Sequence, residues 1–189
     1  MARAYLTDTN IITDNAEPYA TEPVTVAQLK LHMQLEGDAY NDALARMIKA
    51  ARKKIEKYCN VSLVAKAIKV KFNTVGCPEL KLPYPPQDVI TTVGWQKCPS
   101  TWVALESDAS SGYQYWEVDD EAFWKAIVCN QVGNIRITYT TKAIVDNDIY
   151  TQAILMQAGY MYTNRDEANP PEWSPQVQGM LKESRFLTY

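Results

Sequence analysis

The sequence is poor in the residue types on which most enzymatic sites depend. It has one histidine, His32, and seven glycines, none of which forms the G-x-G-x-x-G or P-loop pattern that cradles nucleotide phosphates. A Ser-His-Asp or Cys-His centre would have to use His32, which stands between Leu31 and Met33 in a short amphipathic segment. We therefore expect no enzyme activity, no catalytic residue and no cofactor.

The four cysteines are too far apart for a typical zinc site. Cys59, Cys77, Cys98 and Cys129 lie at least 18 positions from one another, since the closest pair is 59 and 77. Structural zinc sites usually contain a close pair of ligands. No apolar run resembles a signal peptide or a membrane span. The sequence thus predicts no metal site, no membrane contact, and free thiols in a reducing cytoplasm.

After an arm at residues 1–22, two helices are predicted. Thr25 and Gln28 have capping-box spacing, Gly37 is suited to end the first helix, and Asp38 to cap the second. The segment 38–59 is the clearest helix of the chain, because its apolar residues recur at spacings of three and four. These residues are Leu44, Met47, Ile48, Ala51, Ile55 and Tyr58.

The middle of the chain has the period-two pattern of half-buried strands. Strands are expected at 67–72, 79–82, 89–95, 101–105, 113–118, 123–128 and 134–139. Helical spacing returns after Asp146 or Asp148, and Ser174-Pro175 predicts a last short helix. The predicted fold is α+β: a bundle of about four helices (23–64 plus 146–182), an antiparallel β-sheet or barrel insert (65–140), and a C-terminal tail (183–189).

Charge is unevenly distributed along the chain. Residues 46–71 contain nine Lys or Arg and one acid, a net +8, whereas the rest of the chain is at −11 and has an acidic cluster between 106 and 121. Three interpretations fit: a solvated helix face, binding to DNA phosphates, or contact between a basic face of one subunit and an acidic face of its neighbour. Composition alone does not choose among them.

Several segments, taken in order, resemble the head–tail connector (adaptor) proteins of long-tailed phages. The threonine-capped start Pro23–Lys30 leads to the acidic turn Glu36-Gly-Asp38 and to a long helix with Ala50-Ala-Arg52 at its centre. Further similar segments are Leu80-Lys-Leu-Pro-Tyr-Pro-Pro86, Val89–Val93, Ile135–Tyr139, Gln152–Leu155, Tyr162–Arg165 and Val177–Arg185. The resemblance spans roughly residues 22–187.

The resemblance implies a structural role with no catalytic residue to carry over. Family members form a ring, twelve subunits in the virion, beneath the portal, where they extend the DNA channel and give the stopper or tail-completion protein a docking platform. The expected partners are thus other copies of the chain, the portal protein, the stopper or tail-terminator protein, and double-stranded DNA passing without sequence-specific contact. We expect the protein in the neck of the virion, after synthesis in the host bacterial cytoplasm.

The resemblance also gives a meaning to the tail and to the charges. The tail of relatives engages the portal, so Arg185, Phe186, Leu187 and Tyr189 are candidates for portal binding. Because packaged DNA must slide through a ring, the basic segment is expected to meet acidic neighbours or the portal. The candidate subunit-interface residues are Arg46, Lys49, Arg52, Lys53, Lys54, Lys57, Asp119, Asp120 and Glu121.

Two other functions fit the same residues. One is another neck or tail-completion protein, such as a stopper, although the long 38–59 helix argues against that smaller, β-rich class. The other is a DNA-binding packaging factor that uses the basic segment 46–71. A packaging factor predicts tight, salt-sensitive binding to duplex DNA by the isolated protein, whereas an adaptor predicts little.

Overall fold

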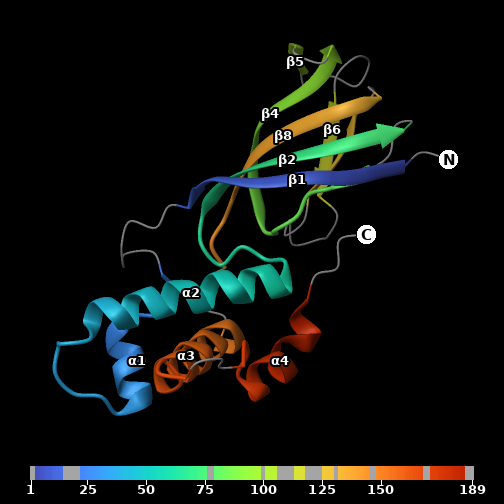
Figure 1. The fold of residues 1–189 in the computed structure, drawn as a ribbon. Helices are drawn as coiled ribbons and strands as arrows, with labels where there is room; N and C mark the ends of the chain where they lie inside the picture. The colour runs from blue at the N-terminus through green and yellow to red at the C-terminus, as the bar shows by residue number, and fades with distance from the viewer. Residues whose placement is uncertain are drawn as a thin grey trace. The chain divides into compact units, whose positions relative to one another are not determined.

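The computed structural model describes residues 3–14, 22–75, 79–98, 101–105, 113–117, 125–129, 132–144, 148–167 and 171–185. The chain divides into two compact units. A helical unit contains the described residues within 16–64 and 144–187, and a β unit contains those within 1–15 and 65–143. The fold is therefore α+β, as the sequence predicts, and all the described strands except the first lie in the sequence between two pairs of helices (Figure 1).

Helix α1 (Val26–Met33) begins with the predicted capping box. The Gln28 amide donates to Thr25 Oγ1 at 3.2 Å, and the Thr25 amide donates to Gln28 Oε1 at 2.8 Å. The helix ends at Met33, however, and not at Gly37 as expected. Gln34 adopts the left-handed conformation (φ 56°), and its N–H donates to the carbonyl of Leu31, so a non-glycine residue closes this helix.

Helix α2 (Asn41–Cys59) starts three residues later than the sequence predicts. Asp38 does not cap it, because its carboxylate accepts from Lys30 Nζ at 2.9 Å and from Asn41 Nδ2 at 3.0 Å in the preceding turn. These contacts with Lys30 and Asn41 hold the pKa of Asp38 below its ordinary value. Tyr40 occupies the N-cap position without a side-chain cap.

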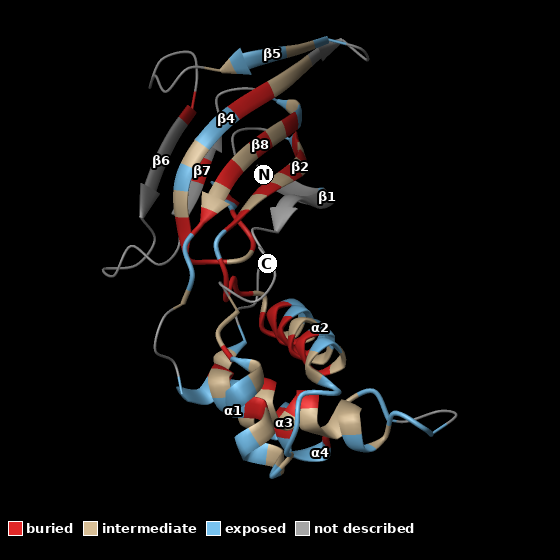
Figure 2. Ribbon diagram, turned by 90° about the vertical axis from the view of Figure 1, so that its left-hand side faces the viewer, coloured by how far each residue is buried: buried red, intermediate tan, exposed pale blue. Residues whose placement is uncertain are grey.

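The remaining helices complete the core of the helical unit. Helix α3 (Asp148–Thr163) runs antiparallel to α2, with Tyr162 near its C-terminal end in edge contact with Tyr40 (ring centroids 6.2 Å apart). Helix α4 (Pro175–Leu181) follows Ser174 as predicted and leads into the 3₁₀ turn Lys182–Ser184. Figure 2 shows the buried stripe of α2. The core includes Leu44, Ile48, Ala51, Ile55, Ala153, Ile154, Ala158, Val177 and Leu181.

The β unit contains every strand that the sequence predicts and one more. A five-stranded antiparallel sheet has the order β1-β2-β8-β4-β5, and a three-stranded sheet has the order β3-β7-β6. Their buried residues, among them Ile68, Ile127 and Ile137, belong to one apolar cluster. The predicted strands are β2 (Lys66–Val75), β3 (Glu79–Lys81), β4 (Gln87–Cys98), β5 (Thr101–Leu105), β6 (Tyr113–Glu117), β7 (Lys125–Cys129) and β8 (Gly133–Thr141).

The additional strand, β1 (Arg3–Asp14), lies where we expected an extended arm. It pairs with β2 along its whole length, from Arg3 opposite Val75 to Asp14 opposite Lys66. The register shifts twice, between Leu6 and Asp8 and between Ile11 and Thr13. Each shift resets the alternation of faces, so a period-two pattern is not sustained in the sequence of this edge strand.

A buried ion pair network links α2 to the segments on either side of it. Arg52 has no exposed surface; its Nε and Nη1 lie 2.7 Å from Glu22 Oε2 and 2.8 Å from Glu56 Oε2. Glu56 Oε1 also accepts the amide of Leu63 at 2.8 Å. Arg52 therefore stands inside the helical unit, and its expected place at a subunit interface is corrected. The sequence did not reveal this burial, because the basic residues next to Arg52 on the helix are solvated. The groups that cover Arg52 come from segments distant in the sequence.

We predict that Arg52→Ala strongly destabilises the protein. Removing the guanidinium leaves two buried carboxylates without their charged partner, which should lower the free energy of unfolding by about 3–5 kcal/mol. Denaturant titration measures this loss. The matched control is Arg46→Ala on the exposed side of the same helix, for which we expect a change of no more than about 0.5 kcal/mol. Equal effects of the two variants would contradict the structural role of the network.

Candidate interaction surfaces

The described residues carry charged, aromatic and hollowed regions on their surface. Within those residues, no group of three or more His, Cys, Asp or Glu side chains could hold a metal ion. None of the helices in the described part of the chain combines the length and apolar character that a membrane span requires.

The solvent-facing stripe of α2 is largely basic. Exposed residues at 42, 46, 50, 53 and 57 recur at helical spacing, and three of them, Arg46, Lys53 and Lys57, form what we call the basic stripe. Lys49 and Lys54 flank it and are half-buried. Of the other predicted interface residues, Arg52 is buried, and Asp119, Asp120 and Glu121 lie outside the described residues.

The basic segment 46–71 is divided between the two units. Its first six basic residues lie on α2 in the helical unit, whereas Lys66, Lys69 and Lys71 lie on β2 in the β unit. Lys66 is buried, with its Nζ 5.1 Å from the centroid of the Tyr84 ring. Burial of Arg52 and Lys66 lowers the positive charge that the segment exposes to solvent.

Aromatic and basic side chains hold the start of the C-terminal tail on the helical unit. The Arg185 guanidinium lies 4.6 Å from the centroid of the Tyr58 ring, and its Nε donates to the Tyr58 carbonyl at 3.2 Å. Tyr58 in turn packs against Trp173 at 5.1 Å, and Lys54 Nζ stands 4.7 Å over the Trp173 ring. We call Lys54, Tyr58, Trp173 and Arg185 the C-terminal cluster.

Lys54 and Tyr150 reinforce this arrangement. Lys54 Nζ donates to the carbonyl of Glu172 and lies 3.5 Å from the Glu172 carboxylate. The Tyr150 hydroxyl donates to the carbonyl of Ser184 at 3.3 Å. Of the predicted portal-binding residues, Arg185 is therefore engaged within its own chain, and Phe186, Leu187 and Tyr189 lie outside the described residues.

Burial beside the cluster keeps two ionisable groups protonated. Burial raises the pKa of the Cys59 thiol to about 12, although the nearby Arg185 charge acts in the opposite direction. Burial likewise raises the pKa of Tyr150 to about 12, and the hydrogen bond to Ser184 partly offsets this rise. At neutral pH Cys59 is thus a protonated, buried thiol with a packing role.

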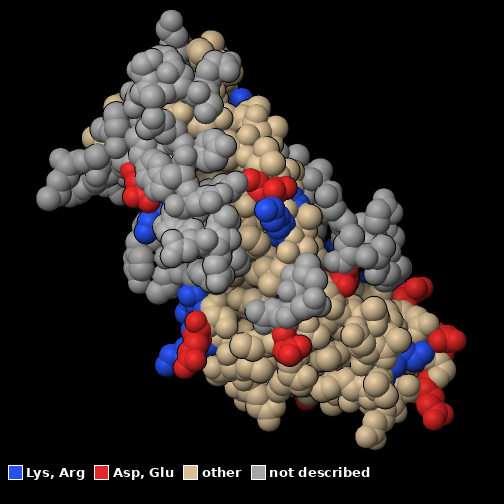
Figure 3. Space-filling view, turned by 180° about the vertical axis from the view of Figure 1, so that it is seen from behind, with Lys and Arg blue, Asp and Glu red and all other residues tan. Residues whose placement is uncertain are grey.

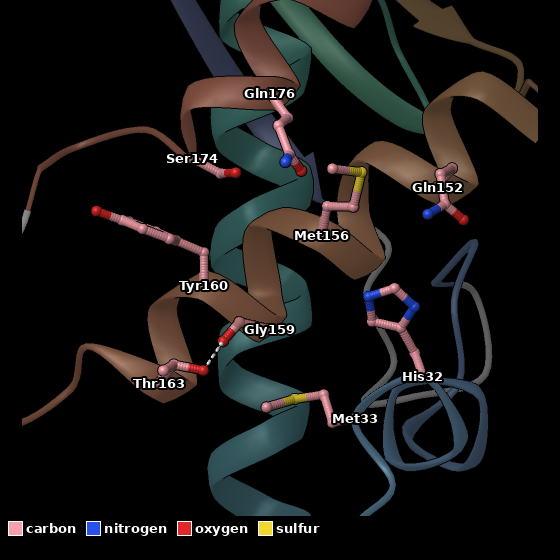
Figure 4. A pocket seen from close by; sticks show the side chains of 9 residues that line it. All are labelled: His32, Met33, Gln152, Met156, Gly159, Tyr160, Thr163, Ser174 and Gln176. Atoms are coloured by element: carbon pink, nitrogen blue, oxygen red, sulfur yellow. Dashed lines mark hydrogen bonds between the residues drawn. The ribbon is translucent and has the colours of Figure 1, made fainter.

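A groove that sequence reasoning missed lies between α1, α3 and the start of α4 (Figure 4). Its volume is about 490 Å³, and its lining includes Met33 from α1 and Met156 from α3. We call it the α3 groove; its lining consists of His32, Met33, Gln152, Met156, Gly159, Tyr160, Thr163, Ser174 and Gln176. One signal could have indicated it: residues 149–164 contain no charged side chain, although they form a helix with outward-facing positions.

Together, these features define a two-unit α+β protein with a basic stripe and a groove on its helical unit. Comparison with known proteins shows which families and structures the chain resembles. Residues 23–82, which include α1, α2 and β2, match the family model of the phage gp6-like head-tail connector proteins. No curated protein matches the sequence significantly.

Three solved structures share the fold over nearly the whole chain. In the neck of an empty gene transfer agent particle computed with C6 symmetry, a chain matches with a TM-score of 0.70 and 17% identity. In the neck of a native gene transfer agent particle computed with C12 symmetry, a chain matches with a TM-score of 0.67 and 19% identity. In the virion of a native gene transfer agent particle, a chain matches with a TM-score of 0.65 and 16% identity. Each match covers 97% of both chains. The resemblance to head–tail connector proteins is thereby confirmed.

We predict that Tyr58→Ala releases the base of the tail. Without the ring, the Arg185 guanidinium loses its stacking partner and Trp173 loses an aromatic neighbour, so the amides of residues 183–185 should exchange faster with deuterium. Hydrogen exchange followed by mass spectrometry measures this change, and α1 should keep its protection. Tyr40→Ala, at the opposite end of α2, is the matched control. Unchanged exchange at 183–185 in Tyr58→Ala would show that the cluster does not anchor the tail.

Proposed function

We propose that this protein is a structural head-to-tail adaptor of a tailed bacteriophage or a related gene-transfer particle. In this proposal its subunits form a dodecameric ring in the neck of the virion, under the portal. The ring extends the DNA channel and provides the docking platform for the stopper or tail. The observation that carries the proposal is the connector-family match at residues 23–82 within a fold shared, over 97% of the chain, with neck proteins.

The charge distribution of the helical unit supports an assembling role. The basic stripe occupies the exposed side of α2, and the turn before this helix carries the exposed acids Glu36 and Asp38. Two different surfaces of opposite sign on one subunit suit head-to-tail contacts, which close into rings. In our proposal the basic stripe, with Lys49 and Lys54 beside it, meets an acidic surface of the neighbouring subunit or of the portal. Asp119, Asp120 and Glu121 remain candidates for that acidic surface.

The tail is the proposed contact with the portal. The C-terminal cluster fixes the chain as far as Arg185, which sets the point on the helical unit where the last four residues begin. Phe186, Leu187 and Tyr189 can then bind apolar sites on the portal, while Arg185 positions them. DNA passes through the ring without a specific contact, and no residue is assigned a catalytic role.

Deletion of residues 186–189 tests the proposal most directly. Mixing the full-length protein with its cognate portal ring should add the mass of about twelve copies, and the deletion variant should add none. Native mass spectrometry measures both. The deletion keeps the contacts of Ser184 and Arg185, so its free energy of unfolding should equal that of the full chain. If the full-length protein adds no mass to the portal ring and instead binds duplex DNA, the protein is a packaging factor and not an adaptor. If the deletion variant still binds the portal, the tail is not the portal contact.

Reversal of the basic stripe tests its part in assembly. In the double variant Lys53→Glu and Lys57→Glu, repulsion should replace attraction, and assembly on the portal should weaken by about tenfold or more at low salt. Light scattering across a salt series measures this effect, because screening weakens contacts between charges. The matched control is Lys81→Glu with Lys142→Glu, at exposed positions of the β unit. Assembly of the stripe variant with wild-type strength and salt dependence would contradict the proposal.

A further inference from the structure

One face of the five-stranded sheet is polar and basic. Along β2 and β8, every second side chain is buried in the apolar core, and the alternate side chains form the opposite face, which we call the outer face. Strands β4 and β5 continue this face beyond β8. Its charged and amide side chains on these four strands are at least partly exposed, and they are Lys69, Lys71, Asn73, Gln96, Asn134 and Arg136.

Three basic residues lie together at the middle of the outer face. Lys71 stands directly opposite Arg136 in the pairing of β2 with β8, and Lys69 is two residues away along β2. Like charges directly opposite each other lower the stability of a sheet. The register places Asp8 of β1 opposite Lys71, so one acidic residue stands against three basic ones. A local arrangement that costs stability in this way is expected at a functional site, and here the charges suit an anion.

Stacking holds the Arg136 guanidinium in place. The guanidinium lies 4.4 Å from the centroid of the Trp102 ring on β5. Both side chains extend over Gly94, where an added Cβ would lie 3.6 Å from the Trp102 ring and 3.9 Å from Arg136 Nη2. A planar guanidinium with a fixed position is suited to bind phosphate oxygens, because its donors are already oriented.

A row of side-chain amides borders the basic residues. Asn73 Nδ2 donates to Asn134 Oδ1 at 2.9 Å, and Asn134 Nδ2 donates to Gln96 Oε1 at 2.7 Å. The row crosses β2, β8 and β4, and on β2 and β8 it lies two residues from Lys71 and Arg136. Amide side chains of Asn and Gln are among the groups that contact phosphates in complexes with DNA.

Among the described residues, the outer face has no apolar centre. Its larger apolar side chains lie at the margins, with Trp102 on the last strand of the sheet and Val75 at the end of β2. Interfaces between proteins have an apolar core that is poor in charge. On the side of the molecule turned to the viewer in Figure 3, by contrast, acidic groups stand beside basic ones. Basic residues at the centre of a polar face therefore favour a polyanion over a protein as the partner.

We propose that the outer face contacts the phosphate backbone of double-stranded DNA, with Lys69, Lys71 and Arg136 each meeting one phosphate. This inference rests on the proposed adaptor function, in which DNA passes through the ring, and it assigns the surface that the DNA meets. Contacts to phosphates carry no sequence information and allow a protein to slide along DNA. Because three contacts are few, a single subunit binds weakly and does not hold the genome in place.

Removal of two of the three charges is the first test. Each phosphate contact adds about −0.9 to the slope of log K against log salt concentration, so about a fourfold rise in salt should weaken wild-type binding about 40-fold. In the double variant Lys69→Gln and Arg136→Gln one contact is left, and the same rise should weaken binding only about 3- to 4-fold. Fluorescence anisotropy of a labelled DNA duplex with the full chain, starting at low salt, measures both values.

The matched control is Lys53→Gln with Lys57→Gln, which removes the same charge from the basic stripe of α2. This control should keep the salt dependence of the wild type. The midpoint of thermal unfolding of the sheet variant should stay near the wild-type value, since relief of the repulsion from Lys71 offsets the stacking lost on Trp102. The proposal is overturned if the wild type does not bind the duplex at low salt, or if only the α2 control loses its salt dependence.

Lysine acetylation tests the surface without any substitution. At low salt, excess duplex DNA should protect Lys69 and Lys71 of the wild-type chain from acetylation and leave Lys53 and Lys57 reactive. Mass spectrometry of peptides measures the protection. Polyglutamate at the same total charge is the comparison, and its protection should be weaker. Equal protection by polyglutamate would indicate an acidic protein as the partner, and protection of Lys53 and Lys57 alone would place the DNA on α2; either result overturns the proposal.

Failure of this inference is distinguishable from failure of the adaptor function. If the wild-type protein adds a ring of subunits to the portal and neither test locates DNA on the outer face, the function stands and the assigned surface is wrong. If the wild-type protein adds no subunits to the portal, the proposed function fails, and the assignment of a surface of the ring to DNA fails with it.

Discussion

The helical unit depends on one buried charge and the two carboxylates that neutralise it. Arg52 holds Glu22, which precedes α1, and Glu56, one turn further along α2. Glu56 also binds the amide of Leu63, just before the chain leaves for β2. The network therefore fixes the points where the chain enters and leaves the helical unit. Such a network need not add stability over an apolar core, but loss of one member leaves unpaired charge in the interior. Its evident effect is to hold the segments of Glu22 and Leu63 at fixed positions against α2.

Local chemistry in the sequence predicted most elements, and it failed where distant segments meet. The Thr25–Gln28 capping box, the Ser174-Pro175 helix start and the alternating strands all depend on neighbours within a few residues, so sequence patterns suffice to find them. The strand β1 was missed because its two register shifts break the alternation. Burial of Arg52 and Lys66 could not be read from the sequence, since the groups that cover a basic side chain come from elsewhere in the chain.

The candidate surfaces were predicted less completely, for a related reason. The basic character of α2 is evident in the sequence, but only the fold separates the exposed Arg46, Lys53 and Lys57 from the buried Arg52. Helical spacing alone places residues 46, 53 and 57 on one stripe. Residue 52 is buried by tertiary contacts, which helical spacing does not predict. The C-terminal cluster joins Tyr58 to Arg185, two residues 127 positions apart, and no local pattern links them. The α3 groove had one signal in the sequence, the absence of charge in residues 149–164. Such a helix is expected to be covered, but the sequence does not say by what.

The exposed charges of α2 suit the first step of an assembly process. Charges act over distance and favour correct encounter and orientation, but exposed pairs contribute little affinity once formed. In the proposed ring, the basic stripe would therefore set the orientation of neighbouring subunits more than the strength of their contact. Subunits held side by side on a docking site would meet at high effective concentration, so contacts too weak to associate free subunits would suffice to close the ring.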